Sequence, residues 1–342
     1  MKKTGVLLIN LGTPDSPTTA DVRKYLREFL NDPRVIDISA AGRFFLVNGI
    51  IVPTRAPKSA KIYQQLWDMW DGESPLLTYG KKLTALTQER FTDDNLTVHF
   101  AMRYQNPSMD MVLAEMKQAV YDHIIILPLF PQNASASTGS AIEKAMRIIE
   151  KWWSIPEISI IDSFHNHPKY IGAFAEKARQ HKPEAFDHVL FSFHGLPERQ
   201  IEKVHPELKC ADCNCPFEFN EKYKLCYRNQ CYDTARLIAS ELTISKDDYT
   251  VCFQSRLGKT PWLTPYSDFV VKQLAKEGKK RILAFSAAFI ADCLETSVEI
   301  GVEYQEIFAE NGGEKVQLVE SLNDSPLWVD AVEEMIRAKM NR

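Results

Sequence analysis

Short apolar runs of strand length alternate with amphipathic helical patterns along almost the whole chain. The strand-like runs are Val6–Leu11, Thr97–Ala101, His123–Leu129, Ile158–Asp162, His188–Phe193, Thr250–Phe253, Arg281–Phe285 and Lys315–Val319. The helical patterns are Thr19–Leu30, Tyr79–Phe91, Met109–Tyr121, Ser140–Trp153, Tyr170–His181, Cys231–Leu242, Ser267–Glu277 and Leu294–Glu310. Strands that alternate with helices form parallel sheets covered by helices on both faces. The pattern therefore predicts an α/β fold.

The length of the chain favours two domains over one. Its 342 residues exceed what a single hydrophobic core usually serves. We expect two similar doubly wound halves, each with a parallel four-stranded sheet flanked by helices. The boundary is placed near residue 165, giving domains 1–165 and 166–342, with the C-terminal helix able to pack back on the first domain. A closed eight-stranded barrel is the structural alternative, but the strands are unevenly spaced and segment 36–71 would be an odd insertion in it.

Charge and hydropathy exclude two functional classes. The chain has 41 Lys and Arg against 45 Asp and Glu, and its net charge of −4 lacks the basic excess of a nucleic-acid binder. No run approaches the ~20 apolar residues that span a bilayer. The apolar start Val6–Ile9 ends too early for a signal peptide. We therefore expect a cytoplasmic protein and allow for peripheral contact with the inner membrane.

Two strand ends carry side chains suited to metal and proton chemistry. In open parallel sheets, ligands bind beyond the carboxyl ends of the strands. His194 follows one predicted strand directly, and Asp292 and Glu295 follow another. An imidazole with a carboxylate suits iron(II), and the imidazole can also act as a general base. The acidic residues continue at steps of three and four along one helical stripe, through Glu299, Glu303, Glu306 and Glu310. A solvated acidic face is the plainer interpretation for the outer members.

Four motifs resemble the ferrochelatase family, the terminal enzymes of haem synthesis. They are Gly5–Pro14, Ser192–Pro197, Gln254–Gly258 with Pro261–Leu263, and Asp292–Thr296. The resemblance runs from about Gly5 to Pro326, in order and at compatible spacing. It implies two Rossmann-like halves with a porphyrin cleft between them. It also implies insertion of iron(II) into protoporphyrin IX, with release of two protons.

The resemblance further implies roles for individual residues. His194 and Glu295 are similar to the family's metal-binding and proton-handling pair, and Asp292, Glu299 and Glu303 to its acidic helix. The positions that resemble porphyrin contacts are Leu11, Arg103, Tyr104, Trp262 and Phe289. We therefore expect the five metal-handling residues to lie near one another.

Segment 36–71 does not fit the alternation of strands and helices. Its apolar residues include Phe44, Phe45, Leu46, Val47, Ile50, Ile51 and Val52, and Arg55, Lys58 and Lys61 follow them. We interpret the segment as a lip whose apolar side chains receive the porphyrin face and touch a membrane surface. Arg55 and Lys58 would then meet propionates or lipid head groups. Ordinary core with a solvated basic edge is the alternative.

Five of the seven cysteines fall within an insertion at 205–231: Cys210, Cys213, Cys215, Cys226 and Cys231. In a reducing compartment such clustered thiols favour metal binding over disulfides. Structural zinc and a two-iron, two-sulfur cluster both take four thiolates, and spacing alone does not separate them. Because some ferrochelatases carry such a cluster, the resemblance favours it over zinc. We expect Cys210, Cys213, Cys215 and Cys226 as ligands, with Cys231 as a substitute.

Two other functions remain open at this point. One is a chelatase of the same fold for another tetrapyrrole or metal, such as coproporphyrin III with iron or a corrinoid precursor with cobalt. The other is a non-catalytic tetrapyrrole or iron–sulfur sensor. The pairing of His194 with Glu295 argues against the sensor, because both residues have chemical roles that mere binding does not need.

Overall fold

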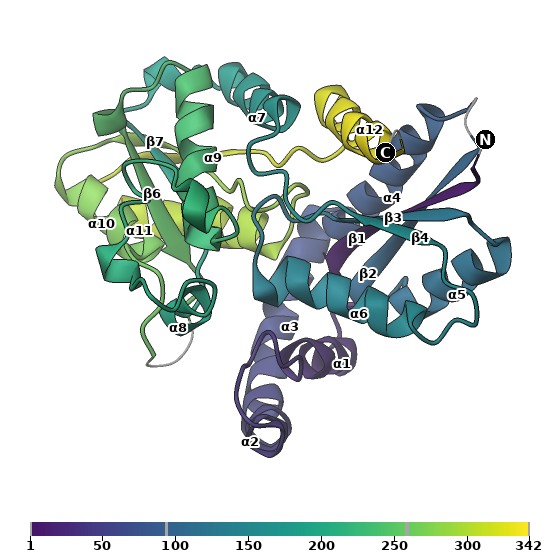
Figure 1. Ribbon diagram of the computed structural model, residues 1–342. Helices are drawn as coiled ribbons and strands as arrows, with labels where there is room; N and C mark the ends of the chain where they lie inside the picture. The colour runs from purple at the N-terminus through teal and green to yellow at the C-terminus, as the bar shows by residue number, and fades with distance from the viewer. Residues whose placement is uncertain (1, 93–94, 257–259, 341–342) are drawn as a thin grey trace. The chain divides into compact units, whose positions relative to one another are not determined.

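The chain forms two compact units, each with its own sheet (Figure 1). The computed structural model describes residues 2–92, 95–256 and 260–340. Unit 1 comprises Met1–Phe130, Ser135–Asp162 and Val332–Arg342, and unit 2 comprises Pro131–Ala134 and Ser163–Ala331. The chain therefore passes between the units after Phe130, Ala134, Asp162 and Ala331.

Unit 1 contains a parallel four-stranded sheet in the order β2-β1-β3-β4. The strands are β1 (Thr4–Gly12), β2 (Leu96–Tyr104), β3 (His123–Pro128) and β4 (Glu157–Ile160). β1 is central, and Leu8 pairs with Phe100 on one side and with Leu127 on the other. Val6–Ile9 are fully buried, as expected of a parallel strand that helices cover on both faces.

The helices of unit 1 either pack on the two faces of this sheet or extend beyond it. They are α1 (Thr19–Leu30), α2 (Ala40–Phe45), π-helix η1 (Leu46–Ile51), α3 (Val52–Met69), α4 (Pro75–Glu89), α5 (Met109–Ala119), π-helix η2 (Ser135–Gly139) and α6 (Ser140–Ile149). On one face, Leu113 of α5 and Ala145 of α6 join Leu7 in a buried apolar cluster. On the other, α4 lies so close that the ring of Phe100 fills the space a Cβ on Gly80 would need.

Unit 2 repeats the strand order of unit 1, with a parallel sheet in the order β6-β5-β7-β8. Its strands are β5 (His188–His194), β6 (Tyr249–Gln254), β7 (Arg281–Phe285) and β8 (Lys315–Val319). In each sheet the second strand in sequence is an edge and the first lies beside it. Two similar open sheets confirm the predicted α/β fold and rule out a closed barrel for the described residues.

Longer helices and short helical turns surround the second sheet. They are α7 (Pro168–Gln180), η3 (Pro183–Ala185), α8 (Glu198–Glu202), η4 (Cys210–Asp212), η5 (Glu221–Tyr223), α9 (Tyr227–Glu241), η6 (Lys246–Asp248), α10 (Ser267–Lys276), π-helix η7 (Glu295–Tyr304), α11 (Gln305–Glu310) and α12 (Pro326–Met340). Leu274 of α10 and Ile300 of η7 pack with Leu190 of β5 in a buried cluster. The end of α12, from Val332, belongs to unit 1.

The acidic segment differs from its predicted form. The sequence predicts one α-helix over Leu294–Glu310, whereas the structure has π-helix η7 followed by α11. Apolar periodicity over so few turns does not distinguish an α-helix, whose backbone hydrogen bonds join residues four apart, from a π-helix, whose bonds join residues five apart. Steps of four residues still place side chains on one side of a π-helix, so the acidic stripe survives the change.

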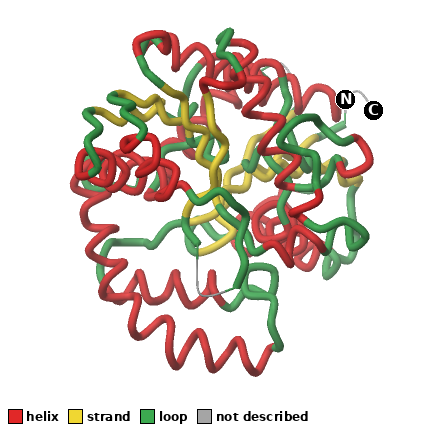
Figure 2. The backbone as a smooth tube through the Cα atoms, turned by 90° about the vertical axis from the view of Figure 1, so that its left-hand side faces the viewer, coloured by secondary structure: helices red, strands yellow, loops and turns green. Residues whose placement is uncertain are grey.

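Segment 36–71 forms helices that extend beyond the strands of unit 1, at the bottom of Figure 2. α3 packs against α1 at its base, where Val47 and Val52 are fully buried with Leu30. Among the described residues, no helix combines the length and the apolar character needed to cross a membrane.

Candidate functional site

His194 is the last residue of β5 and is half-buried at the carboxyl edge of the second sheet. Its Nδ1 lies 2.7 Å from the carbonyl oxygen of Gly195. A carbonyl oxygen only accepts, so Nδ1 must carry the proton. In the neutral imidazole, Nε2 then keeps a free lone pair for a metal or a proton.

The turn behind His194 is packed too tightly for any residue but glycine. The Gly195 amide donates to the carbonyl oxygen of Gln254 over 2.8 Å. A Cβ on Gly195 would lie 2.6 Å from that same oxygen and 3.3 Å from the Trp262 ring. Pro197 and Trp262 form a β-bridge beside it. The position of the imidazole is therefore set by backbone that has little room to move.

Gln254 joins His194 to the acidic helix. It is the last residue of β6 and the register partner of His194. Its Nε2 donates to a carboxylate oxygen of Glu299 over 3.0 Å, and over 3.4 Å to the backbone oxygen of Glu295. Ser255 Oγ donates to the same carboxylate oxygen of Glu299 over 2.7 Å. Gln254 thus links the strand end that carries His194 to η7, but the described side chains of His194, Glu295 and Glu299 do not form a group arranged to hold a metal ion.

The carboxylates of η7 differ in environment along the helix. Burial, reinforced by the nearby Glu295 charge and opposed by the Ser255 and Gln254 hydrogen bonds, raises the pKa of Glu299 to about 7. Glu303 is exposed one step further along, and partial burial of its carboxyl also raises its pKa. The stripe therefore runs from half-buried to solvent-exposed carboxylates.

Asp292 is placed differently from the other acidic residues. Its side chain is buried and accepts hydrogen bonds from Asn323 Nδ2 at 2.7 Å, the Ser321 amide at 3.2 Å and Thr296 Oγ1 at 3.2 Å. Both oxygens are already engaged inside unit 2. This arrangement favours a role in holding the loop before Glu295 over direct contact with a metal.

The two expected porphyrin contacts at the end of β2 are engaged within unit 1. The Arg103 guanidinium donates to Asp32 over 2.5 Å and to Ser140 Oγ over 2.7 Å. The Tyr104 hydroxyl donates to the same Asp32 oxygen over 2.9 Å, and its side chain is fully buried. Leu11, by contrast, is half-buried at the end of β1.

The two expected aromatic contacts of unit 2 differ in burial. Trp262 is 9% exposed, and its buried indole N–H has no hydrogen-bond partner among the described residues. Phe289 is half-buried in the turn after β7. The motif at Gln254–Gly258 is described only as far as Arg256, and Leu257 and Gly258 lie outside the described residues.

The lip segment divides into buried and exposed apolar residues. Val47 and Val52 belong to the core of unit 1, whereas Phe44, Phe45 and Ile50 are 59%, 72% and 61% exposed. Arg55 and Lys58 are also exposed, one turn and two turns into α3. The sequence did not separate the buried apolar residues of this segment from the exposed ones, because it does not show which side of the helix faces the core.

The guanidinium of Arg228 interacts with four of the clustered cysteines in different ways. Arg228 donates to Cys215 Sγ over 2.9 Å and to the Cys210 carbonyl over 3.3 Å, and its charge also acts on the Cys213 and Cys226 thiols. His205 Nε2 lies 3.3 Å from Cys226 Sγ. The fifth, Cys231, is fully buried inside α9 beside Tyr227.

The thiols differ in how readily they ionise. Hydrogen bonds from Cys215 hold the pKa of Cys213 at about 5, despite partial burial. Burial raises the pKa of Cys210 to about 12 and also raises that of Cys226. Across residues 2–92, 95–256 and 260–340, no group of three or more His, Cys, Asp or Glu side chains is arranged to hold a metal ion.

Several residues of this site escaped the sequence analysis. Gln254 and Ser255 lie in a recognised motif without an assigned role, and Tyr227 was not singled out. The contacts of Gln254 and Ser255 depend on β6 lying beside β5, which the order of strands in the sequence does not reveal. The signal that could have found Gln254 is its position at a strand end, as for His194.

Comparison with known proteins agrees with the motifs. The ferrochelatase family model matches residues 3–340. A ferrochelatase of Legionella pneumophila is 43% identical over 97% of this chain and 98% of that protein, and one of Coxiella burnetii is 40% identical over 99% and 94%. The structural match with SirB from Bacillus subtilis with Fe3+ covers 98% of this chain and 94% of the SirB chain, with a TM-score of 0.55 and 12% sequence identity. At this identity the match shows a similar fold alone. The chain is thus a member of the ferrochelatase family.

Proposed function

We propose that His194 and Glu295 carry out the iron insertion that membership of the ferrochelatase family assigns to this chain. In that reaction, iron(II) enters protoporphyrin IX and two protons leave, which is the terminal step of haem synthesis. The observation that carries the proposal is the convergence of His194, Glu295 and Glu299 around Gln254. It supports the proposal because Gln254, the register partner of His194, donates to the Glu299 carboxylate and to the backbone oxygen of Glu295.

Iron insertion needs a base and a metal ligand in one place. The four porphyrin nitrogens hold their lone pairs in the ring plane, so metal enters only as the ring bends and the pyrrole protons leave. The free Nε2 of His194 can accept a pyrrole proton, since Nδ1 donates to Gly195. The Glu295 carboxylate can hold iron(II) as it leaves water and enters the ring.

The acidic stripe offers a route for both iron and protons. Glu295, Glu299 and Glu303 follow one another along η7 toward solvent. Because the pKa of Glu299 is about 7, this carboxyl exchanges protons readily at neutral pH. We propose that iron moves inward along these residues and that protons pass outward through Glu299, while Asp292 holds the loop at the start of the helix.

The porphyrin contacts proposed are Leu11, Arg55, Trp262 and Phe289. Leu11 and Phe289 are half-buried, Trp262 presents an indole without a polar partner among the described residues, and Arg55 is exposed. Arg103 and Tyr104 are proposed to act through Asp32 and Ser140 instead, because both side chains are already engaged there. The exposed Phe44, Phe45 and Ile50 are proposed to contact the porphyrin face or a lipid surface.

The assigned pair is tested with His194→Ala and Glu295→Gln. Each purified variant is mixed anaerobically with iron(II) and protoporphyrin IX while the absorption spectrum is followed. We expect insertion to fall by about a hundredfold or more in both, with porphyrin binding retained in a fluorescence titration. Glu310→Gln, an exposed member of the acidic series, is the control and should insert iron normally. Near-normal turnover of either site variant refutes its assignment.

The same assay distinguishes the alternative functions. Parallel reactions receive coproporphyrin III with iron(II), and a corrinoid precursor with cobalt(II). Preference for coproporphyrin would make the chain a chelatase for a different tetrapyrrole, and binding of either porphyrin without insertion would make it a sensor. We expect protoporphyrin IX with iron(II) to be the best pair.

We propose that the insertion carries a two-iron, two-sulfur cluster held by Cys210, Cys213, Cys215 and Cys226. Four thiols of one insertion are the number of donors that such a cluster takes, and the positive charge of Arg228 opposes the rise in pKa that burial causes at Cys210 and Cys226. When bound, such a cluster supplies reversible one-electron chemistry. Cys231 is a weaker candidate because it lies inside α9 and its thiol is beside Tyr227.

A brown anaerobic preparation that contains iron and sulfide in equal amounts would support the cluster. Colourless protein with stoichiometric zinc would replace it with a structural zinc site. Cys231→Ser should leave the metal content unchanged, whereas Cys213→Ser should lower it.

A further inference from the structure

The first turn of α9 connects the cysteine insertion to the candidate catalytic histidine. Tyr227 is the first residue of α9, directly after Cys226, and its side chain is only 6% exposed. Its hydroxyl donates to the backbone carbonyl of His194 over 2.8 Å. One helical turn therefore holds a proposed cluster ligand and a hydrogen bond to the peptide that carries the imidazole.

This hydrogen bond fixes the peptide plane between His194 and Gly195. The Gly195 amide of the same plane donates to Gln254, and the next carbonyl accepts from His194 Nδ1. Rotating the plane would break the bond to Tyr227 and would shift the carbonyl that orients the imidazole. The direction of Nε2 thus depends on where Tyr227 lies.

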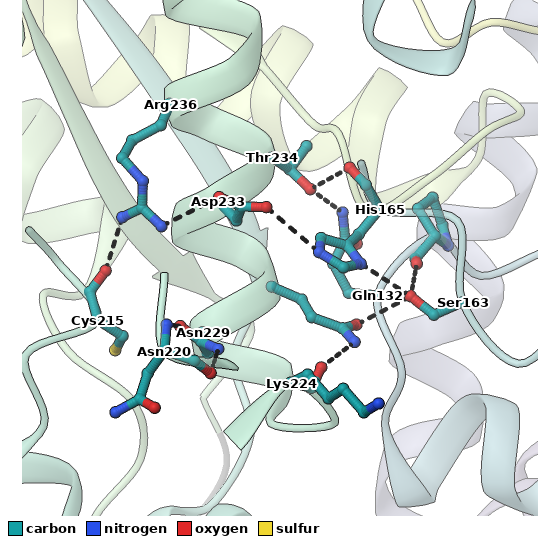
Figure 3. Close-up of polar contacts among 12 residues, drawn as sticks. Gln132, Ser163, His165, Cys215, Asn220, Lys224, Asn229, Asp233, Thr234 and Arg236 are labelled. Atoms are coloured by element: carbon teal, nitrogen blue, oxygen red, sulfur yellow. Dashed lines mark hydrogen bonds and ion pairs between the residues drawn. The ribbon is translucent and has the colours of Figure 1, made fainter. Parts of the chain in front are cut away.

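The remainder of α9 is anchored by a polar network (Figure 3). Gln230 Oε1 accepts from the Asn133 amide at 2.6 Å and from Ser163 Oγ at 3.2 Å, and its Nε2 donates to the Lys224 carbonyl over 2.6 Å. One turn later, Thr234 Oγ1 donates to the His165 carbonyl over 2.9 Å. These bonds prevent α9 from sliding freely along the segments it packs against.

The cysteine insertion is attached to the same helix. Arg236 Nη1 donates to the Cys215 carbonyl over 2.8 Å, as Figure 3 shows, and Arg228 donates to the Cys215 sulfur over 2.9 Å. Asp233 pairs with His165, whose ring stacks on Phe219 of the insertion. In the first turn of α9, Asn229 donates to the carbonyl oxygens of Asn220 and Tyr223 of the insertion over 3.0 and 3.2 Å. A change in how the thiols are held will therefore act on this first turn, to which the insertion is bonded through Arg228 and Asn229.

We infer that Tyr227 is a positioning residue for His194 and that through it the four-thiol insertion supports iron insertion. The inference rests on the proposed role of His194. It assigns the insertion a purpose that needs no electron transfer: the occupied thiol site orders the first turn of α9, and Tyr227 transmits that order to the His194 carbonyl. Loss of the hydroxyl should then impair the chemical step and leave porphyrin binding intact.

Tyr227→Phe tests the positioning role and Tyr249→Phe serves as its control. Both tyrosines are nearly equally buried, at 6% and 7% exposed, but Tyr249 begins β6 at the opposite end of the sheet. We expect kcat to fall about tenfold in Tyr227→Phe with an unchanged KM for porphyrin, and to change less than twofold in Tyr249→Phe. Equal kcat in the two variants would overturn the inference.

The link to the thiols is tested by hydrogen exchange, which does not depend on activity. The full-length protein as purified is compared with Cys213→Ser, Tyr227→Phe and the double variant, and peptides covering residues 189–197 are followed. We expect several-fold faster exchange in each single variant and no further increase in the double variant, because both changes release the same turn. Peptides of β7 should be unaffected. Additive effects, or unchanged exchange at 189–197 in Cys213→Ser, would overturn the link.

The two proposals fail in different ways. If His194→Ala inserts iron normally, the catalytic assignment fails whatever Tyr227 does. If His194→Ala is inactive and Tyr227→Phe matches Tyr249→Phe in kcat and in exchange, only the positioning inference fails.

Discussion

At the scale of single residues, Asp32 is a buried carboxylate on which unit 1 depends. It accepts hydrogen bonds from Ser140, the Arg34 amide, Arg103 and Tyr104. Burial alone would raise the pKa of Asp32, but these donors outweigh it and hold the pKa below its usual value of 3.8. The ionised form is therefore favoured in the folded protein.

Asp32→Asn should destabilise the protein by about 3 kcal/mol at pH 7, because it leaves the Arg103 charge buried without its partner. A lowered pKa contributes stability that is present above 3.8 and is lost as pH falls through the folded-state pKa. The difference from wild type should therefore shrink below about pH 4. Urea unfolding at pH 7, 5 and 3 measures it. Asp110→Asn, which removes an exposed pair with Lys144, should cost under about 1 kcal/mol.

Gly195→Ala should disrupt the turn behind His194. The new Cβ would lie 2.6 Å from the Gln254 carbonyl oxygen, which is backbone and cannot rotate away. We expect a loss of about 1–3 kcal/mol in stability and a fall in kcat of at least tenfold. Thermal unfolding and the iron-insertion assay measure the two effects. Gly49→Ala, where nothing lies within 4 Å, is the control for stability and should unfold at the wild-type temperature.

The sequence pointed to those candidate residues whose position after a predicted strand was enough to single them out. His194 and Glu295 follow strands, and that position alone made them candidates. Gln254 and Tyr227 matter through neighbours that lie far away in sequence, so their roles required the strand order and the start of α9. The hydrogen bonds that Arg103 donates to Asp32 and that Asp292 accepts from Asn323 could not be predicted either, because these partners also lie far away in the sequence.

At the scale of elements, the lip presents its exposed aromatic side chains at the end of α2. Phe44 and Phe45 pack edge to face, with ring centroids 5.8 Å apart, and remain largely exposed. A segment that combines exposed apolar side chains with cations, here Arg55 of α3, is typical of surfaces that meet anionic lipids. The buried Val47 and Val52 meanwhile anchor the segment to unit 1.

The double variant Phe44→Ser/Phe45→Ser should lose association with anionic lipid vesicles in a flotation assay. Its folded core should be unaffected, because neither ring is buried. Met111→Ser removes a side chain of α5 that is 49% exposed and should still float with the vesicles. If wild type itself does not float with anionic vesicles, the membrane contact is wrong.

The sequence predicted whether a segment is helix or strand better than where a helix begins or how its backbone is hydrogen-bonded. The helical pattern of the acidic segment was correct in its extent, but periodicity could not reveal the π-helical bonding of η7. Similarly, the helix predicted from Cys231 begins at Tyr227, because Cys226 is its cap and the preceding residues belong to the insertion. Both differences fall next to the candidate site.

At the scale of the whole molecule, the alternation of strands and helices predicted two parallel sheets, and this is confirmed. Their order could not be predicted, since alternation alone allows several arrangements of four parallel strands. The structure also assigns the last turns of α12 to unit 1, which is otherwise built from residues before 163. Ile336 is fully buried there, and Arg337 lies over the Phe91 ring and donates to the Arg90 carbonyl over 2.9 Å.

Ile336→Ala should therefore weaken unit 1 more than unit 2. Removing a fully buried isoleucine side chain costs about 2–5 kcal/mol. Hydrogen exchange should quicken in β1 and β3 well before β5 and β7 respond. Ala338→Ser changes an exposed position of the same helix and should leave both sheets unchanged. An equal increase in hydrogen exchange in the two sheets would contradict the assignment of the end of α12 to unit 1.

The division of the chain also sets an order for its synthesis. Residues 332–342 complete unit 1, yet they leave the ribosome only after every residue of unit 2 has been translated. Unit 2 can therefore mature while its neighbour is still unfinished and exposed to chaperones or proteases. Termination of synthesis just before residue 332 should thus harm mainly the half of the protein that was made first.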